Sequence, residues 1–288
     1  MKKRGAEEAP LFSHGHYASI RAMIIKLIIL AGLGLCFGSF VNALTWRIHK
    51  KKDWVKERSV CTHCGHQLAA KDLVPVLSWV SLRGKCRYCA RRISIQYPVV
   101  ELAAALVFMA SYAFWPVGLG NGQSVLLVTW LVCSIGLLAL FIYDARWMLL
   151  PNKIIYPTFA LAAIGQFIYL VGFAPDKPAF LIGWGLSILA ASGLFWSLFV
   201  ISQGRWIGYG DVRLGLITGT ILHSPALSIL MIFLASLMGS LAVLPLLLTG
   251  KKKLSAKLPY GPVLILAAFI CLLFGQSIID WYKNSFLS

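Results

Sequence analysis

The chain has 288 residues, of which 59% are hydrophobic and only 13% are charged. This composition is too apolar for a soluble globular domain and is typical of a polytopic membrane protein. The net charge of +17 would suit nucleic acid. However, the basic residues cluster in alternate loops, as membrane topology demands, so we expect no nucleic-acid partner.

The N-terminal part of the chain is predicted to form a tail and one transmembrane helix. Residues 1–22 are polar, of mixed charge and without periodicity, and we interpret them as the tail. The apolar run that follows predicts the first transmembrane helix over residues 23–46, because it is about as long as a bilayer span. It lacks a small-residue cleavage site, so we expect no cleavable signal. Asn42 within it needs a polar partner and is expected to face the protein interior.

The rest of the chain divides into a polar insert, residues 47–97, and an apolar body, residues 98–288. Apolar runs in the body predict further segments at 98–117, 123–143, 154–173, 178–201, 212–223, 226–248 and 260–281. Segment 212–223 is too short to cross a bilayer alone, since a regular helix rises about 1.5 Å per residue. The predicted fold class is an all-α polytopic membrane protein with about eight transmembrane helices and a small zinc-ribbon-like cytoplasmic insert.

The two sides of the predicted membrane body carry very different numbers of Lys and Arg residues. The insert holds twelve and the loops on its side hold eight, which makes twenty, whereas the opposite side holds six. The positive-inside rule therefore puts the insert in the cytoplasm and both termini outside. The same rule puts Asp144 and Asp211 at the cytoplasmic face.

Asp144 and Asp211 are two of only ten acidic residues, and both lie against membrane-like sequence. An ionised carboxylate at the edge of hydrocarbon is costly, which makes each a candidate functional residue. Two close carboxylates titrate as a unit, so one can take a proton from water while the other polarises a scissile carbonyl, as in aspartic proteases. The alternative is that each pairs with a nearby base, Arg146 or Arg213, and only anchors a helix end.

Four cysteines in the insert form two Cys-x-x-Cys pairs, Cys61 with Cys64 and Cys86 with Cys89. Their spacing is close to that of zinc ribbons, and four thiolates suit a closed, tetrahedral, structural Zn²⁺ site. Disulfides are disfavoured in a reducing cytoplasm. The other cysteines lie in apolar runs and are interpreted as small buried hydrophobic residues: Cys36, Cys133 and Cys271.

Two further features have both a structural and a functional interpretation. Glu101 opens the second span, where a negative charge stabilises a helix N-terminus, and the alternative is contact with a polar substrate. A basic face is expected from Arg83, Lys85, Arg87, Arg91 and Arg92. It reflects either topology alone or contact with anionic lipid headgroups.

Taken in order, these motifs closely resemble those of the type 4 prepilin peptidases, a family of bifunctional leader peptidases and N-methyltransferases. The resemblance covers nearly everything after the tail, and the order and spacing of the motifs make it specific. The matching motifs are 38–42 with Arg47, both Cys-x-x-Cys pairs, Tyr97-Pro98 with Glu101, Asp144 before 149–152, the Gly-x-Gly-Asp stretch 208–214, and 258–262. The chain departs from the family pattern at Thr62, Asn152 and Tyr260, none of which belongs to the proposed pair.

The resemblance implies an aspartyl endopeptidase of the bacterial cytoplasmic (inner) membrane, with Asp144 and Asp211 as its catalytic residues. It would cut the basic leader from type IV prepilins or type II secretion pseudopilins, its implied partners beside the lipid bilayer. It would then methylate the new N-terminal amine, with S-adenosylmethionine as methyl donor. No nucleotide-binding loop of known type marks the cofactor-binding residues.

Two other hypotheses come from different classes of protein. A membrane transporter or scaffold with a zinc-stabilised cytoplasmic module would let prepilin processing survive the loss of Asp211. A membrane-tethered zinc-ribbon nucleic-acid binder would need stacking aromatic residues among its basic ones. Trp54, Trp79 and Tyr88 offer little such pattern.

Overall fold

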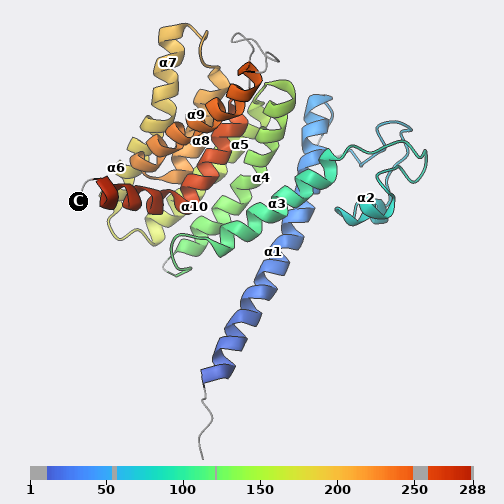
Figure 1. Cartoon of the computed structure of the whole chain (residues 1–288), viewed down its shortest axis with the longest axis horizontal. Coiled ribbons are helices and arrows are strands. Elements are labelled where there is room, and N and C mark those ends of the chain that lie inside the picture. Colours follow the sequence, from blue (N-terminus) through green and yellow to red (C-terminus); the bar gives the residue numbers. More distant parts are fainter. Residues whose placement is uncertain (1–11, 54–56, 121, 249–258, 287–288) are drawn as a thin grey trace, which may run out of the picture.

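The computed structural model describes residues 12–53, 57–120, 122–248 and 259–286, which form an all-helical protein (Figure 1). The only β-type pairing among these residues is two isolated bridges in the insert. The helical elements are α1 (Phe12–His49), η1 (Ala70–Asp72), α2 (Leu77–Ser81), α3 (Gln96–Ala113), α4 (Gln123–Trp147), α5 (Asn152–Gly172), α6 (Lys177–Ile188), η2 (Leu189–Gly193), α7 (Leu194–Ser202), α8 (Tyr209–Leu222), α9 (Pro225–Leu248) and α10 (Gly261–Phe286).

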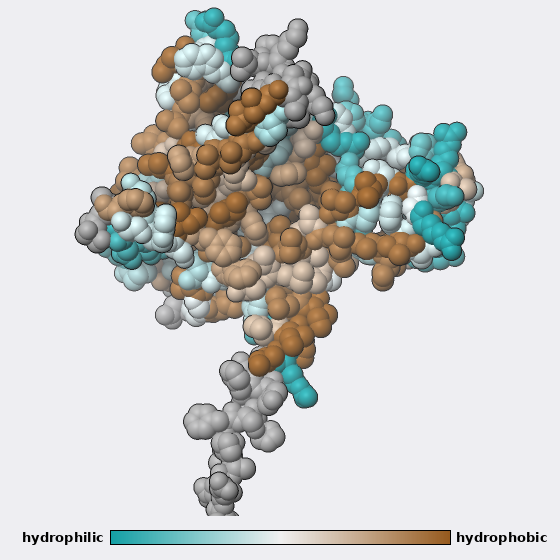
Figure 2. Space-filling view, in the orientation of Figure 1, coloured by the Kyte–Doolittle hydropathy of each residue, from teal (hydrophilic) through white to brown (hydrophobic). Residues whose placement is uncertain are grey.

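Seven helical stretches in the described part of the chain are long and apolar enough to cross a membrane. They are α1, α3, α4, α5, the continuous α6–η2–α7 helix, α9 and α10. The six after α1 begin within two residues of their predicted starts. Hydrophobic residues cover most of the bundle surface in Figure 2, as expected for a surface in contact with lipid. The predicted all-α polytopic class is thereby confirmed.

The remaining expected segment is α8, which has only 14 residues. Its length of about 21 Å falls short of the roughly 30 Å hydrocarbon core. Its start lies by the end of α4, since Asp211 and Asp144 interact there. At its other end, His223 Nε2–H donates to the carbonyl of Phe180, near the start of α6, over 3.0 Å. Other helices surround α8, so this pass need not match the bilayer thickness.

Helix α1 is longer than the sequence predicts. It begins at Phe12, so residues 12–22 of the expected tail are helical, and residues 1–11 lie outside the described part. No Gly or Pro stands between Gly15 and Gly32, so nothing in that stretch stops the helix. The helix also continues past the predicted boundary at residue 46 and ends at His49, so it carries the chain into the insert.

Helices α1 and α3 pack through small residues spaced four apart. A Cβ added at Gly34 would lie 2.6 Å from the Cα of Ala105, and one added at Gly38 would lie 2.6 Å from the Cα of Glu101. Only glycine lets two helix backbones approach this closely, as in Gly-x-x-x-Gly contacts of membrane proteins. The contact holds the helices on either side of the insert against each other.

Polar contacts then fasten the insert to this helix pair. Asn42 is buried, and its Nδ2 donates to the carbonyl of Tyr97 over 3.2 Å, which confirms that it faces the protein interior. Gln96 donates back to Asn42 Oδ1 over 3.3 Å. The backbone N–H of Val76 donates to Glu101 Oε2 over 2.7 Å. These bonds satisfy buried polar groups and fix the base of the insert.

A second pair of glycines places α8 against the π-helical segment η2. A Cβ added at Gly215 would lie 2.9 Å from the Cα of Ser192, and one at Gly219 would lie 2.8 Å from the carbonyl oxygen of Ser187. The hydroxyl of Ser187 donates to the Gly219 carbonyl over 2.8 Å, and that of Ser192 donates to the Val212 carbonyl over 2.9 Å. These contacts hold α8 closely against η2 along most of its length.

The glycine contact between α1 and α3 can be tested with a matched pair of substitutions. We expect Gly38→Leu to destabilise the protein by roughly 1–3 kcal/mol, because a side chain there must push the α3 backbone away. Gly32→Leu should be neutral, since nothing lies within 4 Å of a Cβ at that position. Thermal unfolding in lipid nanodiscs measures both, and equal midpoints for the two variants would contradict the contact.

Candidate active site and metal centre

Two carboxylates meet where α4 ends and α8 begins. Asp144 lies in the last turn of α4 and is 5% exposed. Asp211 lies in the first turn of α8 and is partly buried. The two groups are close enough to interact electrostatically, although 66 intervening residues separate them in the sequence. The structure thus brings together the two acidic residues singled out from the sequence, which we call the carboxylate pair.

Neither member of the carboxylate pair forms an ion pair with a basic residue in the described ranges. Arg146 lies over the ring of Trp147, 5.1 Å from its centroid. Arg213 donates to the side-chain oxygen of Asn152 and lies over the ring of Tyr209. The two arginines that the alternative, purely structural interpretation pairs with the aspartates therefore make other contacts.

The start of α10 forms one wall of this site. The backbone N–H of Gly261 donates to Asp144 Oδ2 over 3.1 Å, and a Cβ added at Gly261 would lie 2.7 Å from the same oxygen. The neighbouring Tyr260 interacts electrostatically with Asp211 and packs edge-on against Phe195. Figure 1 shows α4 ending and α10 beginning at the same end of the bundle.

In the sequence, residues 258–262 stand out only as a motif of the resembling family, and the contact with Asp144 was not predicted. The one sequence feature that could have indicated the contact is the glycine at the start of the last span, Gly261. A side chain there would collide with Asp144.

The two glycines before Asp211 shape the approach to the pair. Gly208 caps α8 with an extended backbone, and its carbonyl accepts the N–H of Asp211 over 3.0 Å. A Cβ added at Gly210 would lie 2.9 Å from Leu150 in the connection between α4 and α5. Close packing at Gly210 therefore brings that connection against the start of α8.

The four insert cysteines converge, as predicted, whereas Cys36 of α1 is exposed and not buried as expected. The four insert sulfur atoms all lie within 4.8 Å of one another, and no other described residue belongs to the cluster. Burial raises the pKa of the Cys61 thiol, but hydrogen bonds from the backbone of Cys64 and His63 outweigh it and lower that pKa to about 7. The nearby His66 is not part of the cluster and packs its ring against that of Tyr88, with centroids 3.6 Å apart. The four-thiol donor set fits a tetrahedral metal site.

Both Cys-x-x-Cys turns are built in the same way. The N–H of Cys61 donates to the carbonyl of His66 over 2.9 Å, and that of Cys86 donates to the carbonyl of Arg91 over 2.8 Å. One isolated bridge flanks each turn. Two equivalent turns that face each other are how zinc ribbons present four sulfurs to one ion.

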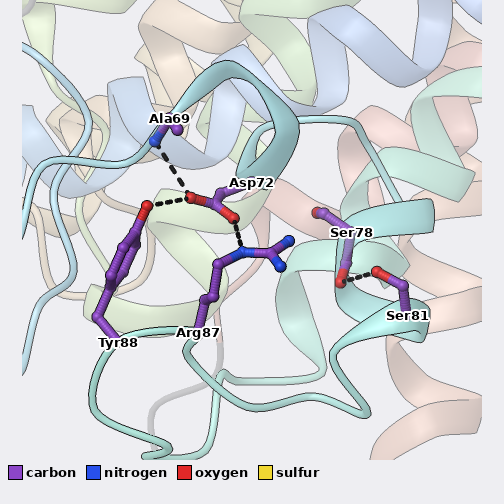
Figure 3. A network of polar contacts seen from close by, with 6 residues as sticks. All are labelled: Ala69, Asp72, Ser78, Ser81, Arg87 and Tyr88. Atoms are coloured by element: carbon purple, nitrogen blue, oxygen red, sulfur yellow. Dashed lines mark hydrogen bonds and ion pairs between the residues drawn. The ribbon is translucent and has the colours of Figure 1, made fainter.

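Asp72 ties η1 to the second of these turns (Figure 3). It accepts hydrogen bonds from Arg87 Nε over 2.7 Å, from the Tyr88 hydroxyl over 2.9 Å and from the backbone N–H of Ala69 over 3.2 Å. The hydrogen bond from the Arg87 guanidinium is the main cause of a lowered pKa of the Asp72 carboxyl. The Asp72 carboxylate thus links the η1 segment to the second Cys-x-x-Cys turn and stabilises the insert.

A chamber of about 680 Å³ lies between the insert and the helices that carry it. Its walls come from both Cys-x-x-Cys turns, from α1, from the start of α3 and from the end of α4. The chamber was not predicted from the sequence, because its walls come from distant parts of the chain. Its wall includes Arg146, two residues after Asp144, so the chamber and the carboxylate pair both use the last turn of α4.

Fold and site define a multi-pass helical membrane protein that holds a carboxylate pair at one end of its bundle and a four-thiol module beside it. Two family models match the chain. The Bacterial Peptidase A24 N-terminal domain matches residues 33–115, and the Type IV leader peptidase family matches residues 131–244. The chain belongs to the type IV leader peptidase family.

Curated relatives match this chain along most of their length. A protein of Aeromonas hydrophila is 33% identical over 277 residues, covering 88% of this chain and 92% of the relative. A protein of Pseudomonas aeruginosa is 30% identical, covering 87% and 91%. A protein of Bacillus subtilis is 31% identical, covering 89% and 97%. Each is named prepilin leader peptidase/N-methyltransferase. No solved structure matches the chain significantly.

Proposed function

We propose that the protein cuts the basic leader from type IV prepilins or type II secretion pseudopilins and then methylates the new N-terminal amine. The observation that carries this proposal is the carboxylate pair, drawn from α4 and α8 and left without a basic partner among the described residues. Its family and its curated relatives support the same activity. They give no support to the transporter or scaffold alternative.

The chemistry proposed for the pair needs no metal. One carboxylate takes a proton from a water molecule, which attacks the scissile carbonyl, while the protonated carboxyl polarises that carbonyl. Two interacting carboxyls share these protons as a unit, so the roles belong to the pair rather than to either residue. The Gly261 N–H, which donates to Asp144, orients one member of the pair.

The orientation proposed for the chain suits its substrate. The insert and the carboxylate pair face the cytoplasm, because twenty basic residues lie on that side and six on the other. The location is then the bacterial inner membrane. The seven long helices and the short pass α8 make an even number, so both termini lie outside. A substrate with a basic cytoplasmic leader and an apolar helix in the bilayer presents its cleavage site at this interface.

The four-thiol cluster is proposed to hold one structural Zn²⁺, bound by Cys61, Cys64, Cys86 and Cys89. When bound, the ion supplies folding free energy to the insert, because such a small polar segment has little core of its own. The chemistry of the carboxylate pair lies on other elements and does not involve it.

The carboxylate pair is tested by conservative substitutions. Asp144→Asn and Asp211→Asn should each lower leader cleavage by at least about a thousandfold, and the double variant should be no worse, because the two act as a unit. The control is Asp280→Asn, at an exposed carboxylate near the end of α10. Mass spectrometry of a co-expressed prepilin gives the result. Full processing by either single variant would rule out the assignment.

The metal site is tested by elemental analysis of the purified protein. Wild-type protein and the control Cys36→Ser should contain one zinc per chain, whereas a Cys61→Ser, Cys64→Ser double variant should lose it. We expect that variant to lose more methylation than cleavage, because the insert unfolds while the carboxylate pair stays in place. A zinc-free wild-type protein with both activities would contradict the site. A double variant that methylates pre-cut pilin but cuts nothing would contradict the link between the insert and methylation.

Topology is tested by cysteine labelling with a membrane-impermeant reagent. A cysteine introduced at Lys71, exposed in the insert, should react only after the cells are permeabilised. A cysteine introduced at Gly118, in the loop between α3 and α4, should react in intact cells. The reverse pattern would overturn the orientation.

A further inference from the structure

The chamber between the insert and the helices has the size of a nucleoside site. Its volume of about 680 Å³ falls in the range of about 300–1,000 Å³ that is usual for small-molecule pockets. Three aromatic side chains line it: Trp46, Trp79 and Tyr97. Trp79 is held in place, because its Nε1–H donates to the carbonyl of Ile93 over 3.2 Å. Such rings offer flat apolar surfaces to a purine base.

The chamber has a positive wall. Six arginines line it: Arg47, Arg58, Arg87, Arg91, Arg92 and Arg146. Arg87 is committed to Asp72, with which it forms an ion pair of 2.7 Å. Arg91 and Arg92 follow the second Cys-x-x-Cys turn and are exposed. Guanidinium groups of this kind recognise carboxylates through paired hydrogen bonds.

The chamber lining also includes a negative group, Glu101 of α3, besides Asp72, which is paired with Arg87. The Glu101 carboxylate accepts hydrogen bonds from the backbone N–H of Val76 and from the hydroxyl of Ser39, both of them uncharged donors. These donors hold the carboxylate in place without cancelling its charge. The chamber therefore offers guanidinium groups, four of them from the insert and two from α1 and α4, together with the Glu101 carboxylate on α3. A ligand that fits it carries an anion, a cation and an aromatic ring.

We propose that this chamber binds the methyl donor S-adenosylmethionine, with the donor's carboxylate at Arg91 and Arg92 and its sulfonium towards Glu101. This inference rests on the proposed function, which requires such a donor. It assigns methyl transfer to a site distinct from the carboxylate pair, although both sites use the last turn of α4, where Arg146 of the chamber wall follows Asp144 by two residues.

The transfer step balances without a further reactant. The lone pair of the neutral pilin amine forms an N–C bond to the methyl group, while the C–S bond breaks and leaves its electron pair on sulfur. The sulfonium becomes a neutral thioether, and the new ammonium loses one proton to water. The positive wall of the chamber favours the neutral amine that this step needs.

The experiment measures ligand affinity for the full-length protein in nanodiscs of zwitterionic lipid. Three probes separate the two charged contacts: S-adenosylmethionine, its demethylated product S-adenosylhomocysteine, which lacks the sulfonium, and methylthioadenosine, which lacks the carboxylate. Glu101→Gln keeps an acceptor for Val76 and removes only the charge. This variant should lower the affinity for S-adenosylmethionine about tenfold and the affinity for S-adenosylhomocysteine by about twofold at most.

The arginine wall gives the complementary result. The double variant Arg91→Gln, Arg92→Gln should lower the affinities for S-adenosylmethionine and S-adenosylhomocysteine about tenfold each. Its affinity for methylthioadenosine should be unchanged. The matched control is Arg83→Gln, which removes an insert arginine outside the chamber lining and should change no affinity. Zinc content and leader cleavage show that each variant is folded. The inference would be overturned if Glu101→Gln lost affinity equally for S-adenosylmethionine and S-adenosylhomocysteine. Unchanged affinities in the double variant would also overturn it.

Asp144→Asn separates this inference from the proposed function. It should stop cleavage and leave all three affinities unchanged. If it cuts normally while the chamber variants behave as predicted, the proposed peptidase assignment is wrong and the binding site stands. If wild-type protein cuts and methylates pilin but its affinities do not respond to the chamber variants, only the inference is wrong.

Discussion

Holding two interacting carboxylates at the edge of hydrocarbon is the constraint on which the rest of the structure depends. Each charge there is costly unless it is solvated, paired or put to use. The protein brings the two together from α4 and α8, and the described residues supply no basic partner to either. Close helix contacts at Gly215 and Gly219 keep α8 from moving away. The backbone of Gly261 completes the site at a distance that no other residue permits.

Close helix contacts at glycine also support the insert. Gly34 and Gly38 bring α1 against α3, and these helices carry the two ends of the insert. Glu101 then serves both parts, since it lies on α3 and accepts the N–H of Val76 from the insert. Cutting and methylation are thus proposed for two places on one frame, one at the end of the bundle and the other beneath the four-thiol module.

Much of this arrangement follows from the sequence, because the bilayer imposes length and polarity on each span. The helix starts from α3 onward and the cysteine cluster were predicted because hydropathy and Cys-x-x-Cys spacing are local signals. The early start of α1 at Phe12 was missed, because a polar stretch with no helix-breaking residue gives no signal of its own. The contact of Gly261 with Asp144 and the chamber were also missed. Both depend on residues far apart in sequence, whose meeting only the packed bundle determines.

The account is tested most directly by the intact mass of a prepilin incubated with the purified protein, with and without S-adenosylmethionine. Without the donor, we predict a product that has lost its leader and nothing else. With the donor, the same product should gain the mass of one methyl group. A prepilin that keeps its leader under both conditions would contradict the account.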